Sequence, residues 1–309
     1  MISERYKDRL DLLLQVLPYV AKEKVFALKG GTAINLFVRN MPRLSVDIDL
    51  HYLPIKSRDE SLQEIEAALG RIKNDLETYI RDIHVNLSKP KGTDRDLKLN
   101  CQLNRAQIKI EVNSITRGVI APVRMMQINK QVQDQFGKFA AINVVSHGEL
   151  FGGKILAALA RQHPRDLFDI KILLENEGID KSVRLGFITM LLSHYKPIHE
   201  LLNPEMKDQK SAFNAQFSGM TELEFTYSDY EKTREEIIPA IKRKLTNKDK
   251  KLLIGFTSGN PDWELCPIEV LKDLPAVKWK LLNIKKLATD NPSKHNSLIE
   301  SLRAVLNVR

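Results

Sequence analysis

The chain has 309 residues, 43% of them hydrophobic and 28% charged, which is enough for about two domains and excludes a disordered or membrane-embedded protein. The net charge of +9 suits an anionic partner such as RNA, DNA or a nucleotide. Cys101 and Cys266 are far apart in the sequence and match no zinc-ligand spacing, so we expect both thiols to be free. The sequence shows neither a signal peptide nor an apolar run long enough to span a membrane, so we expect a cytoplasmic protein.

The first elements predicted along the chain are a helix, a strand and a glycine turn. Apolar residues recur with a helical period over residues 4–22, and residues 25–28 form a short apolar run. Lys29-Gly30-Gly31-Thr32 follows as a turn, and a short helix then ends at Asn40-Met41-Pro42. The predicted order is therefore helix, strand, glycine turn, helix.

Two later segments alternate strictly between apolar and polar residues, as half-buried strands do. In residues 46–52 one side carries Val46, Ile48, Leu50 and Tyr52, and the other carries Asp47, Asp49 and His51. In residues 107–113, Glu111 lies on the polar side between Lys109 and Asn113. A helix is predicted over residues 58–80 between the two strands, and Lys89-Pro90-Lys91-Gly92 is predicted as a turn.

The second half of the chain has a helical pattern nearly to its end. Ser146 and Glu149 have the spacing of a capping box, and Pro164 and Gly178 bracket a further helix. We therefore expect an α+β fold, with a mixed sheet and flanking helices in residues 1–145 and a mainly helical domain in residues 146–309. The basic run at residues 242–251 is either a solvated face or a surface that contacts phosphates.

Asp47 and Asp49 are the strongest candidates for chemistry. Carboxylates at positions i and i+2 of one strand point the same way and can together hold divalent ions such as Mg²⁺ or Mn²⁺. Glu111 from a neighbouring strand would complete this metal site, which suits phosphoryl or nucleotidyl transfer. The alternative is that an isolated D-x-D pair lies on a solvated sheet face.

The glycine turn adds a second, anion-binding feature. Gly30 and Gly31 leave the backbone bare, and Thr32 offers a hydroxyl group at the start of a helix, where N–H groups attract phosphate. An ordinary tight turn is the structural alternative. Other familiar arrangements are missing from the sequence: paired zinc-ligand histidines, G-x-S-x-G, a P-loop and G-x-G-x-x-G.

These motifs resemble those of the AbiEii/AbiGii-type (MenT-like) toxin nucleotidyltransferases of the DNA polymerase β superfamily. The family's first element, a glycine pair with a hydroxyl residue followed by R-x-S-x-D-x-D, corresponds to Gly30-Gly31-Thr32 and Arg43-Leu44-Ser45-Val46-Asp47-Ile48-Asp49. The resemblance implies a nucleotide-binding set that also includes a later lysine: Gly30, Gly31, Thr32, Arg43, Ser45 and Lys154.

The family's later elements, a helical lysine and R-D-x-x-D, correspond to Lys154 and to Arg165-Asp166-Leu167-Phe168-Asp169. The resemblance gives Lys154 and Asp166 catalytic roles, with Arg165 and Asp169 in support. A surface lysine and carboxylates that favour the helix dipole are the structural alternatives. The segments around Trp263 and Trp279 also resemble the family, and for both tryptophans we expect core packing more than base stacking.

The resemblance implies an abortive-infection type toxin of a toxin–antitoxin system. Its reaction would be metal-dependent transfer of a nucleoside monophosphate from an NTP to an acceptor hydroxyl at the 3′ end of a tRNA acceptor stem. A modified tRNA could not be charged, so translation would stop, and a cognate antitoxin is expected. Nucleotidyl transfer to a protein or small molecule, NTP-dependent phosphotransfer, and catalytically silent nucleic-acid binding stay open as alternatives.

Overall fold

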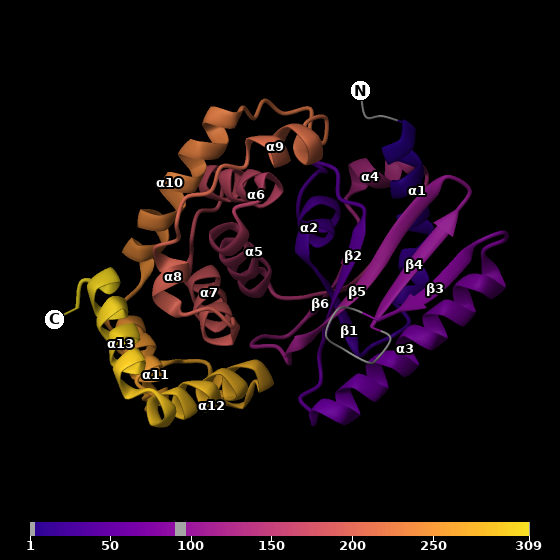
Figure 1. The fold of residues 1–309 in the computed structure, drawn as a ribbon. Coiled ribbons are helices and arrows are strands. Elements are labelled where there is room, and N and C mark those ends of the chain that lie inside the picture. Colours follow the sequence, from indigo (N-terminus) through magenta and orange to yellow (C-terminus); the bar gives the residue numbers. More distant parts are fainter. Residues whose placement is uncertain (1–3, 90–96, 309) are drawn as a thin grey trace. The chain divides into compact units, whose positions relative to one another are not determined.

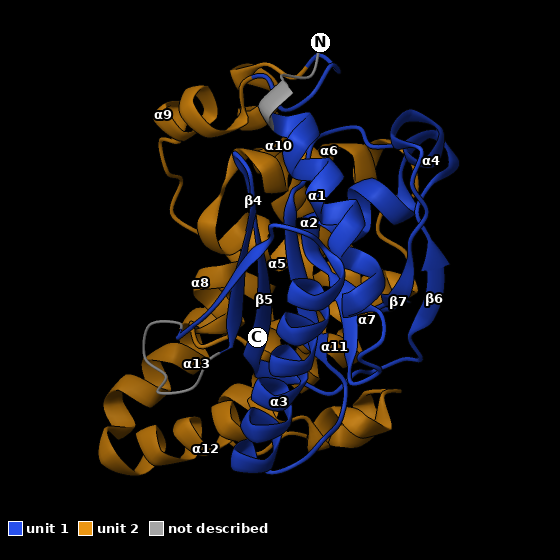
Figure 2. Ribbon diagram, turned by 90° about the vertical axis from the view of Figure 1, so that its right-hand side faces the viewer, with its two compact units in different colours: residues 1–146, 219–224 blue, residues 147–218, 225–309 orange. Residues whose placement is uncertain are grey.

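The computed structural model describes residues 4–89 and 97–308, and these divide into two compact units. Unit 1 is residues 1–146 and 219–224, and unit 2 is residues 147–218 and 225–309 (Figure 2). The short segment Gly219–Glu224 therefore belongs with the first unit, although it lies between two stretches of the second in the sequence. The backbone N–H of Leu44 donates to the Met220 carbonyl, and the Thr221 hydroxyl donates to the Pro42 carbonyl.

Unit 1 is built on a mixed sheet, which within the described residues has seven strands in the order β3-β4-β5-β2-β1-β7-β6 (Figure 1). β2 runs parallel to β5, and β1 runs parallel to β7, while the other neighbours are antiparallel. The strands are β1 (Phe26–Lys29), β2 (Asp47–Tyr52), β3 (His84–Ser88), β4 (Lys98–Leu103), β5 (Ala106–Arg117), β6 (Arg124–Gln127) and β7 (Ala141–Val144).

The helices of unit 1 cover the sheet and form the glycine turn. They are α1 (Glu4–Val20), α2 (Gly30–Thr32) with its π-helical continuation η1 (Ala33–Val38), α3 (Arg58–Tyr79) and α4 (Lys130–Phe136). The apolar stripes of α1 and α3 are buried with the apolar side of β2 and β5, which gives unit 1 its core. A turn was predicted at Lys89-Pro90-Lys91-Gly92. Of these four residues, only Lys89 is among the described residues.

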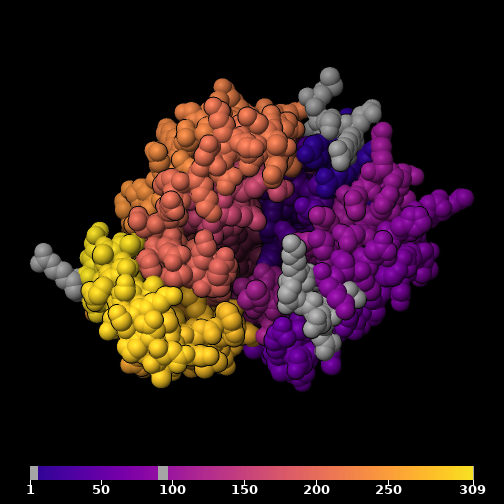
Figure 3. Space-filling model, in the orientation of Figure 1, coloured from indigo at the N-terminus to yellow at the C-terminus, as the bar shows by residue number. Residues whose placement is uncertain are grey.

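Unit 2 is helical. Its elements are α5 (His147–Arg161), α6 (Pro164–Glu175), α7 (Lys181–Ser193), α8 (Ile198–Leu202), α9 (Lys210–Ala212), η2 (Phe213–Phe217), α10 (Tyr227–Lys244), α11 (Asn247–Thr257), η3 (Trp263–Leu265), η4 (Glu269–Asp273), α12 (Pro275–Asp290) and α13 (Pro292–Leu306). Figure 3 shows the surface of its later helices in orange to yellow. The α+β class predicted from the sequence is confirmed.

Glycines bring α5 and α7 of unit 2 into backbone contact. A Cβ atom on Gly152 would lie 2.3 Å from the Phe187 nitrogen, and one on Gly186 would lie 1.9 Å from the Gly148 oxygen. Only glycine permits such an approach.

Within residues 4–89 and 97–308, we find no helix with the length and apolar composition that crossing a membrane requires.

Candidate active site

The turn after β1 contains two glycines that lie in close contact with the surrounding side chains. Gly30 has a φ of +74°, and a Cβ atom there would lie 2.5 Å from the Asp49 Oδ2 atom. A Cβ atom on Gly31 would lie 2.7 Å from the Arg43 Nη2 atom and 2.9 Å from the Ser45 Oγ atom. The predicted glycine turn and the R-x-S-x-D-x-D segment are therefore packed directly on each other.

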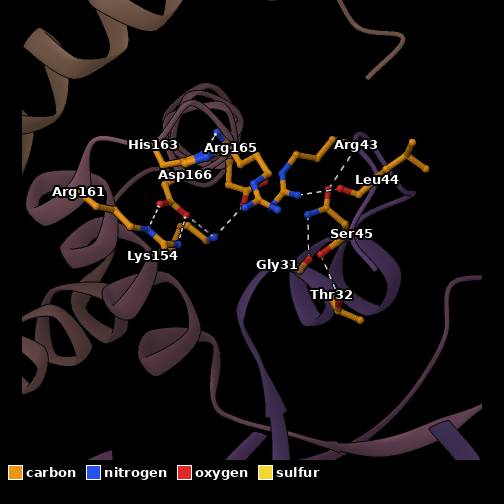
Figure 4. A network of polar contacts seen from close by, with 12 residues as sticks. Gly31, Thr32, Arg43, Leu44, Ser45, Lys154, Arg161, His163, Arg165 and Asp166 are labelled. Carbon is orange, nitrogen blue, oxygen red and sulfur yellow. Dashed lines mark hydrogen bonds and ion pairs between the residues drawn. The ribbon is translucent and has the colours of Figure 1, made fainter. Parts of the chain in front are cut away.

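Polar contacts fix this packing inside unit 1 (Figure 4). The Thr32 side chain is buried, and its hydroxyl donates to the Asp47 carbonyl and lies 3.0 Å from the Ser45 Oγ atom. Asn35 donates to the Gly31 carbonyl over 2.9 Å and accepts from the backbone N–H of Arg43. Thr32 thus ties the turn to the strand that carries the aspartates, and its predicted contact with phosphate stays a prediction.

Asp47, Asp49 and Glu111 lie on one face of the sheet. Asp47 and Asp49 alternate with buried residues on β2, and Asp49 is the register partner of Glu111 on the parallel strand β5. Because register partners on parallel strands point to the same face, the three carboxylates share it. The side chains of Asp47 and Glu111 are 42% and 48% exposed, so solvent reaches both.

Each of these carboxylates also has a basic neighbour within unit 1. The Arg9 Nη2 atom on α1 lies 3.9 Å from the Asp47 Oδ1 atom, and Lys98 on β4 forms an ion pair with Glu111. Lys29 on β1 is the register partner of Asp49. Burial lowers the pKa of Lys29, and the negative charge of Asp49 partly offsets this effect. Basic side chains of unit 1 therefore balance part of the negative charge on this face of the sheet.

The carboxylate set suits a divalent ion, since carboxylate oxygens are the ligands that Mg²⁺ and Mn²⁺ prefer. Asp47 and Asp49 fit this role directly, because they project from one strand face beside the bare backbone of Gly30. Among the described residues no three His, Cys, Asp or Glu side chains are gathered closely enough to hold a metal ion. Glu111 would have to leave Lys98 to join the pair.

His51 shares the polar side of β2 but is buried and already satisfied. Its Nε2 atom lies 2.6 Å from the Gly118 carbonyl oxygen. Burial and the charge of Lys29 lower the pKa of His51 to about 4, so the ring is neutral at physiological pH. We assign it a structural role.

The second charged cluster lies within unit 2, on α5 and α6 (Figure 4). The Lys154 Nζ atom donates to the Asp166 Oδ1 atom over 2.9 Å and lies 3.0 Å from the Asp169 Oδ2 atom. Arg161 binds Asp166 through two hydrogen bonds of 2.5 and 2.9 Å. Both aspartates are 1% exposed, so two buried carboxylates are balanced by two cations.

These cations decide the protonation state of Asp166. Burial alone would raise the pKa of its carboxyl group, but the charge of Lys154 and the hydrogen bonds from Arg161 outweigh burial and hold the pKa well below its usual range. Asp166 is therefore ionised at neutral pH. The Arg161 side chain is 65% exposed, so the cluster presents a cation to solvent while Lys154 stays buried.

The N-terminus of α6 places Asp166 in this cluster. The His163 Nδ1 atom accepts a hydrogen bond of 3.2 Å from the backbone N–H of Arg165, and Pro164 occupies the first turn. Asp166 consequently sits where the helix dipole favours a negative charge. Arg165 precedes it in the sequence and is half-buried, and Asp169 follows one turn later.

Comparison with known proteins identifies the family. The family model described as "Nucleotidyl transferase AbiEii toxin, Type IV TA system" matches residues 11–281. This chain belongs to the AbiEii nucleotidyl transferase toxin family. A solved structure of the MenT4 nucleotidyltransferase toxin of Mycobacterium tuberculosis H37Rv is similar, with 14% identity, a TM-score of 0.61, and coverage of 91% of this chain and 95% of that chain. Comparison with curated protein sequences gives no significant match.

This chain is therefore a nucleotidyltransferase of a type IV toxin–antitoxin system. The family resemblance inferred from the sequence motifs and the predicted enzyme class are both confirmed. The MenT4 similarity supports the fold across most of the chain, since at this identity it carries no residue-level information.

Three basic neighbours of the carboxylates were not predicted from the sequence: Arg9, Lys29 and Lys98. Lys29 is paired with Asp49 by the antiparallel register of β1 and β2, which are separated by α2 and η1 in the sequence, and Arg9 is brought near Asp47 by the packing of α1. One expectation about packing is wrong: Trp263 packs against Phe256, but Trp279 is 56% exposed. Lys280 takes the buried position on α12, where it donates to the Leu191 and Lys196 carbonyls, and this turns Trp279 outward.

Proposed function

We propose that this AbiEii toxin transfers a nucleoside monophosphate from an NTP to the 3′-terminal hydroxyl of a tRNA. The hydroxyl oxygen attacks the α-phosphorus, the bond from that phosphorus to the bridging oxygen breaks, and pyrophosphate leaves. The observation that carries the proposal is the placement of Asp47 and Asp49 on one face of β2, directly against the Gly30-Gly31 turn. A bare backbone beside two carboxylates suits a triphosphate that brings its own divalent ions.

Each proposed role follows from residue chemistry. Asp47 and Asp49, with Glu111, would hold Mg²⁺ or Mn²⁺. When bound, such ions neutralise charge on the triphosphate and lower the pKa of the attacking hydroxyl. The turn of Gly30, Gly31 and Thr32, braced by Arg43 and Ser45, would position the phosphates against backbone N–H groups.

The charged cluster of unit 2 on α5 and α6 is the second part of the proposal. Lys154 is proposed to be the lysine that the family resemblance assigns to the triphosphate. Its buried Nζ atom is held by Asp166 and Asp169. Asp166, kept ionised by Lys154 and Arg161, is proposed to stabilise the positive charge of Lys154 throughout the reaction, and Arg165 is proposed to support it. Positioning and charge compensation together would lower the barrier.

A tRNA acceptor is supported by the net charge of +9 and by the toxin family itself. A tRNA with an altered 3′ end cannot be aminoacylated, so translation in the cytoplasm would stop, as an abortive-infection response requires. A cognate antitoxin would then keep the toxin silent in unstressed cells.

The test uses NTPs labelled at either the α- or the γ-phosphate, incubated with the purified chain and with total tRNA or total protein. We expect the α label alone to enter tRNA, and sequencing of tRNA 3′ ends to show the added nucleotides. Label found only in protein would overturn the tRNA acceptor, and transfer of the γ label would indicate a phosphotransferase.

Asp47→Ala and Asp49→Ala should each abolish transfer to tRNA. Asp134→Ala, which removes an exposed acid on α4 in the same unit, is the matched control and should leave transfer intact. Retained transfer in both active-site variants would contradict an enzymatic function for these carboxylates.

A further inference from the structure

A dense basic corner joins α10 to α11 in unit 2. The last turn of α10 carries three cations and the start of α11 carries three more, with a two-residue connection between the helices. These residues are Lys242, Arg243, Lys244, Lys248, Lys250 and Lys251. Arg243, Lys244, Lys248 and Lys251 are exposed. We call these four residues the basic corner.

The single acid within this run does not offset the corner. Asp249 is buried, caps α11 together with Thr246, and forms an ion pair with Arg184 of α7. Within residues 4–89 and 97–308, none of the six basic side chains forms an ion pair. The buried Leu245 fixes the connection, so the cations project from a defined bend and not from a loose tail.

Helix stability explains only half of these cations. Lysine and arginine in the last turn of α10 complement the negative end of its dipole. Lys248 and Lys251 lie near the N-terminus of α11, where the dipole is positive and a cation is unfavourable. The negative end of α10 and the positive end of α11 meet at this corner and oppose each other, so its excess positive potential comes from the side chains. Such a cluster of exposed cations favours a polyanion.

An RNA backbone fits the corner better than a protein surface does. Protein interfaces have an apolar centre with aromatic or aliphatic anchors. In the described chain, no exposed large apolar side chain lies between Tyr227 and Thr257. Phosphate contacts need no such centre, because counterion release from the nucleic acid supplies the free energy.

We propose that the basic corner binds the phosphate backbone of the acceptor RNA. This inference rests on the proposed function for the identity of the RNA. It assigns Arg243, Lys244, Lys248 and Lys251 to RNA affinity and leaves them outside the chemical step.

The experiment measures the equilibrium binding of the full chain to fluorescently labelled total tRNA between 50 and 300 mM KCl, by anisotropy. The test variant combines Arg243→Gln, Lys244→Gln, Lys248→Gln and Lys251→Gln. The control variant removes the same charge from scattered exposed lysines of unit 2 through Lys181→Gln, Lys210→Gln, Lys272→Gln and Lys294→Gln.

Each phosphate contact contributes roughly 0.7–0.9 to the slope of log K against log salt. We expect the test variant to lose about three from this slope and at least about tenfold in affinity at 100 mM KCl, and the control to keep the wild-type slope. The pairs Arg243→Gln with Lys244→Gln and Lys248→Gln with Lys251→Gln should each lose about half as much, which guards against misfolding of the fourfold variant. Equal slopes in test and control variants would overturn the proposal.

Transfer assays separate this inference from the proposed function. If wild-type protein labels tRNA but the slopes are equal, the basic corner is refuted and the proposed reaction stands. If wild-type protein does not label tRNA but the test variant alone loses slope, the corner stands as an RNA-binding surface and the proposed acceptor is refuted. At saturating tRNA the fourfold variant should retain the wild-type kcat.

Discussion

Gly30 lies so close to Asp49 that a Cβ atom on Gly30 would be 2.5 Å from the Asp49 Oδ2 atom. The antiparallel pairing of β1 with β2 causes this approach, because Lys29 is paired with Asp49 and Gly30 is the next residue. The same turn requires a φ of +74° at Gly30. Conformation and contact thus both demand glycine at this position.

The first prediction is that Gly30→Ala abolishes nucleotidyl transfer while the protein stays folded. The new methyl group must displace the Asp49 carboxylate, and the left-handed backbone costs alanine about 1–2 kcal/mol. Activity should fall by at least about 100-fold, since charge stabilisation depends on carboxylate position. Transfer assays and urea denaturation measure the two effects.

Gly137→Ala is the control for Gly30→Ala. Gly137 also has a positive φ, of +59°, but no heavy atom lies within 4 Å of the position of its Cβ. It should lose similar stability and keep full activity. Equal activity in the two alanine variants would show that the Gly30 contact with Asp49 has no catalytic importance.

The second prediction concerns the ion pair between Lys98 and Glu111. If Glu111 joins the metal site, Lys98→Ala should tighten Mn²⁺ binding about two- to fivefold, because it removes a competing positive charge at a partly exposed position. Glu111→Gln should weaken Mn²⁺ binding. Electron paramagnetic resonance of free Mn²⁺ gives both affinities without any assay of turnover.

Lys138→Ala serves as the control for Lys98→Ala, since Lys138 forms a comparable part-exposed ion pair with Asp11 in the same unit. Its Mn²⁺ affinity should match that of the wild type. Unchanged affinity in both Lys98→Ala and Glu111→Gln would remove Glu111 from the metal site and leave Asp47 and Asp49 as its protein ligands.

The third prediction separates two neighbouring glycines on α5. Gly152→Ala should cost about 2–3 kcal/mol of unfolding free energy, because its Cβ atom would lie 2.3 Å from the Phe187 backbone nitrogen on α7. Gly153→Ala should gain about 0.5–1 kcal/mol, since nothing lies within 4 Å and alanine favours helix. Urea denaturation of both variants gives the difference, and equal values would contradict the tight packing of α5 on α7.

The fourth prediction is a pH dependence that originates at His163. Its Nδ1 atom caps α6 only when unprotonated, and its Nε2 atom lies 3.0 Å from the Gln216 Oε1 atom. Burial lowers the pKa of His163, with the charges of Arg165 and Arg161 adding to that effect, while the Gln216 hydrogen bond and Asp166 oppose it. The cap therefore contributes fully above the unfolded pKa of about 6.5, and its contribution is lost as the pH falls through the lower folded value.

His163→Asn tests this dependence, because asparagine caps helices well and does not titrate in this range. Between pH 7 and pH 5 we expect wild-type stability to fall by about 1 kcal/mol more than that of the variant. Urea denaturation at both pH values makes the comparison. Parallel losses in the two proteins would refute titration of the cap.

The sequence predicts best where one local pattern determines the structure. Strict alternation over residues 46–52 predicted a strand, observed as Asp47–Tyr52, and the helical period over residues 58–80 predicted α3 closely. The partners of these elements could not be predicted in the same way. The approach of Arg9 to Asp47 depends on how α1 packs on the sheet, and no local spacing encodes that packing.

The candidate site shows the same limit. Lys154, Asp166 and Asp169 were selected by resemblance, and the structure shows that they form one buried, charge-balanced cluster. A helical spacing cannot reveal burial, because exposed and buried lysines have the same spacing. For Trp279 the sequence predicted burial and the structure shows exposure. The neighbouring Lys280 is buried on α12 in its place.

The return of residues 219–224 to unit 1 has a consequence for synthesis of the toxin. The backbone N–H of Leu44, three residues before Asp47, donates a hydrogen bond to the Met220 carbonyl. Unit 1 is therefore incomplete when only its first 146 residues have left the ribosome. More than seventy further residues must emerge first. A ribosome-bound fragment that ends before this point would lack this hydrogen bond to the R-x-S-x-D-x-D segment and the one from Thr221 to the adjacent Pro42.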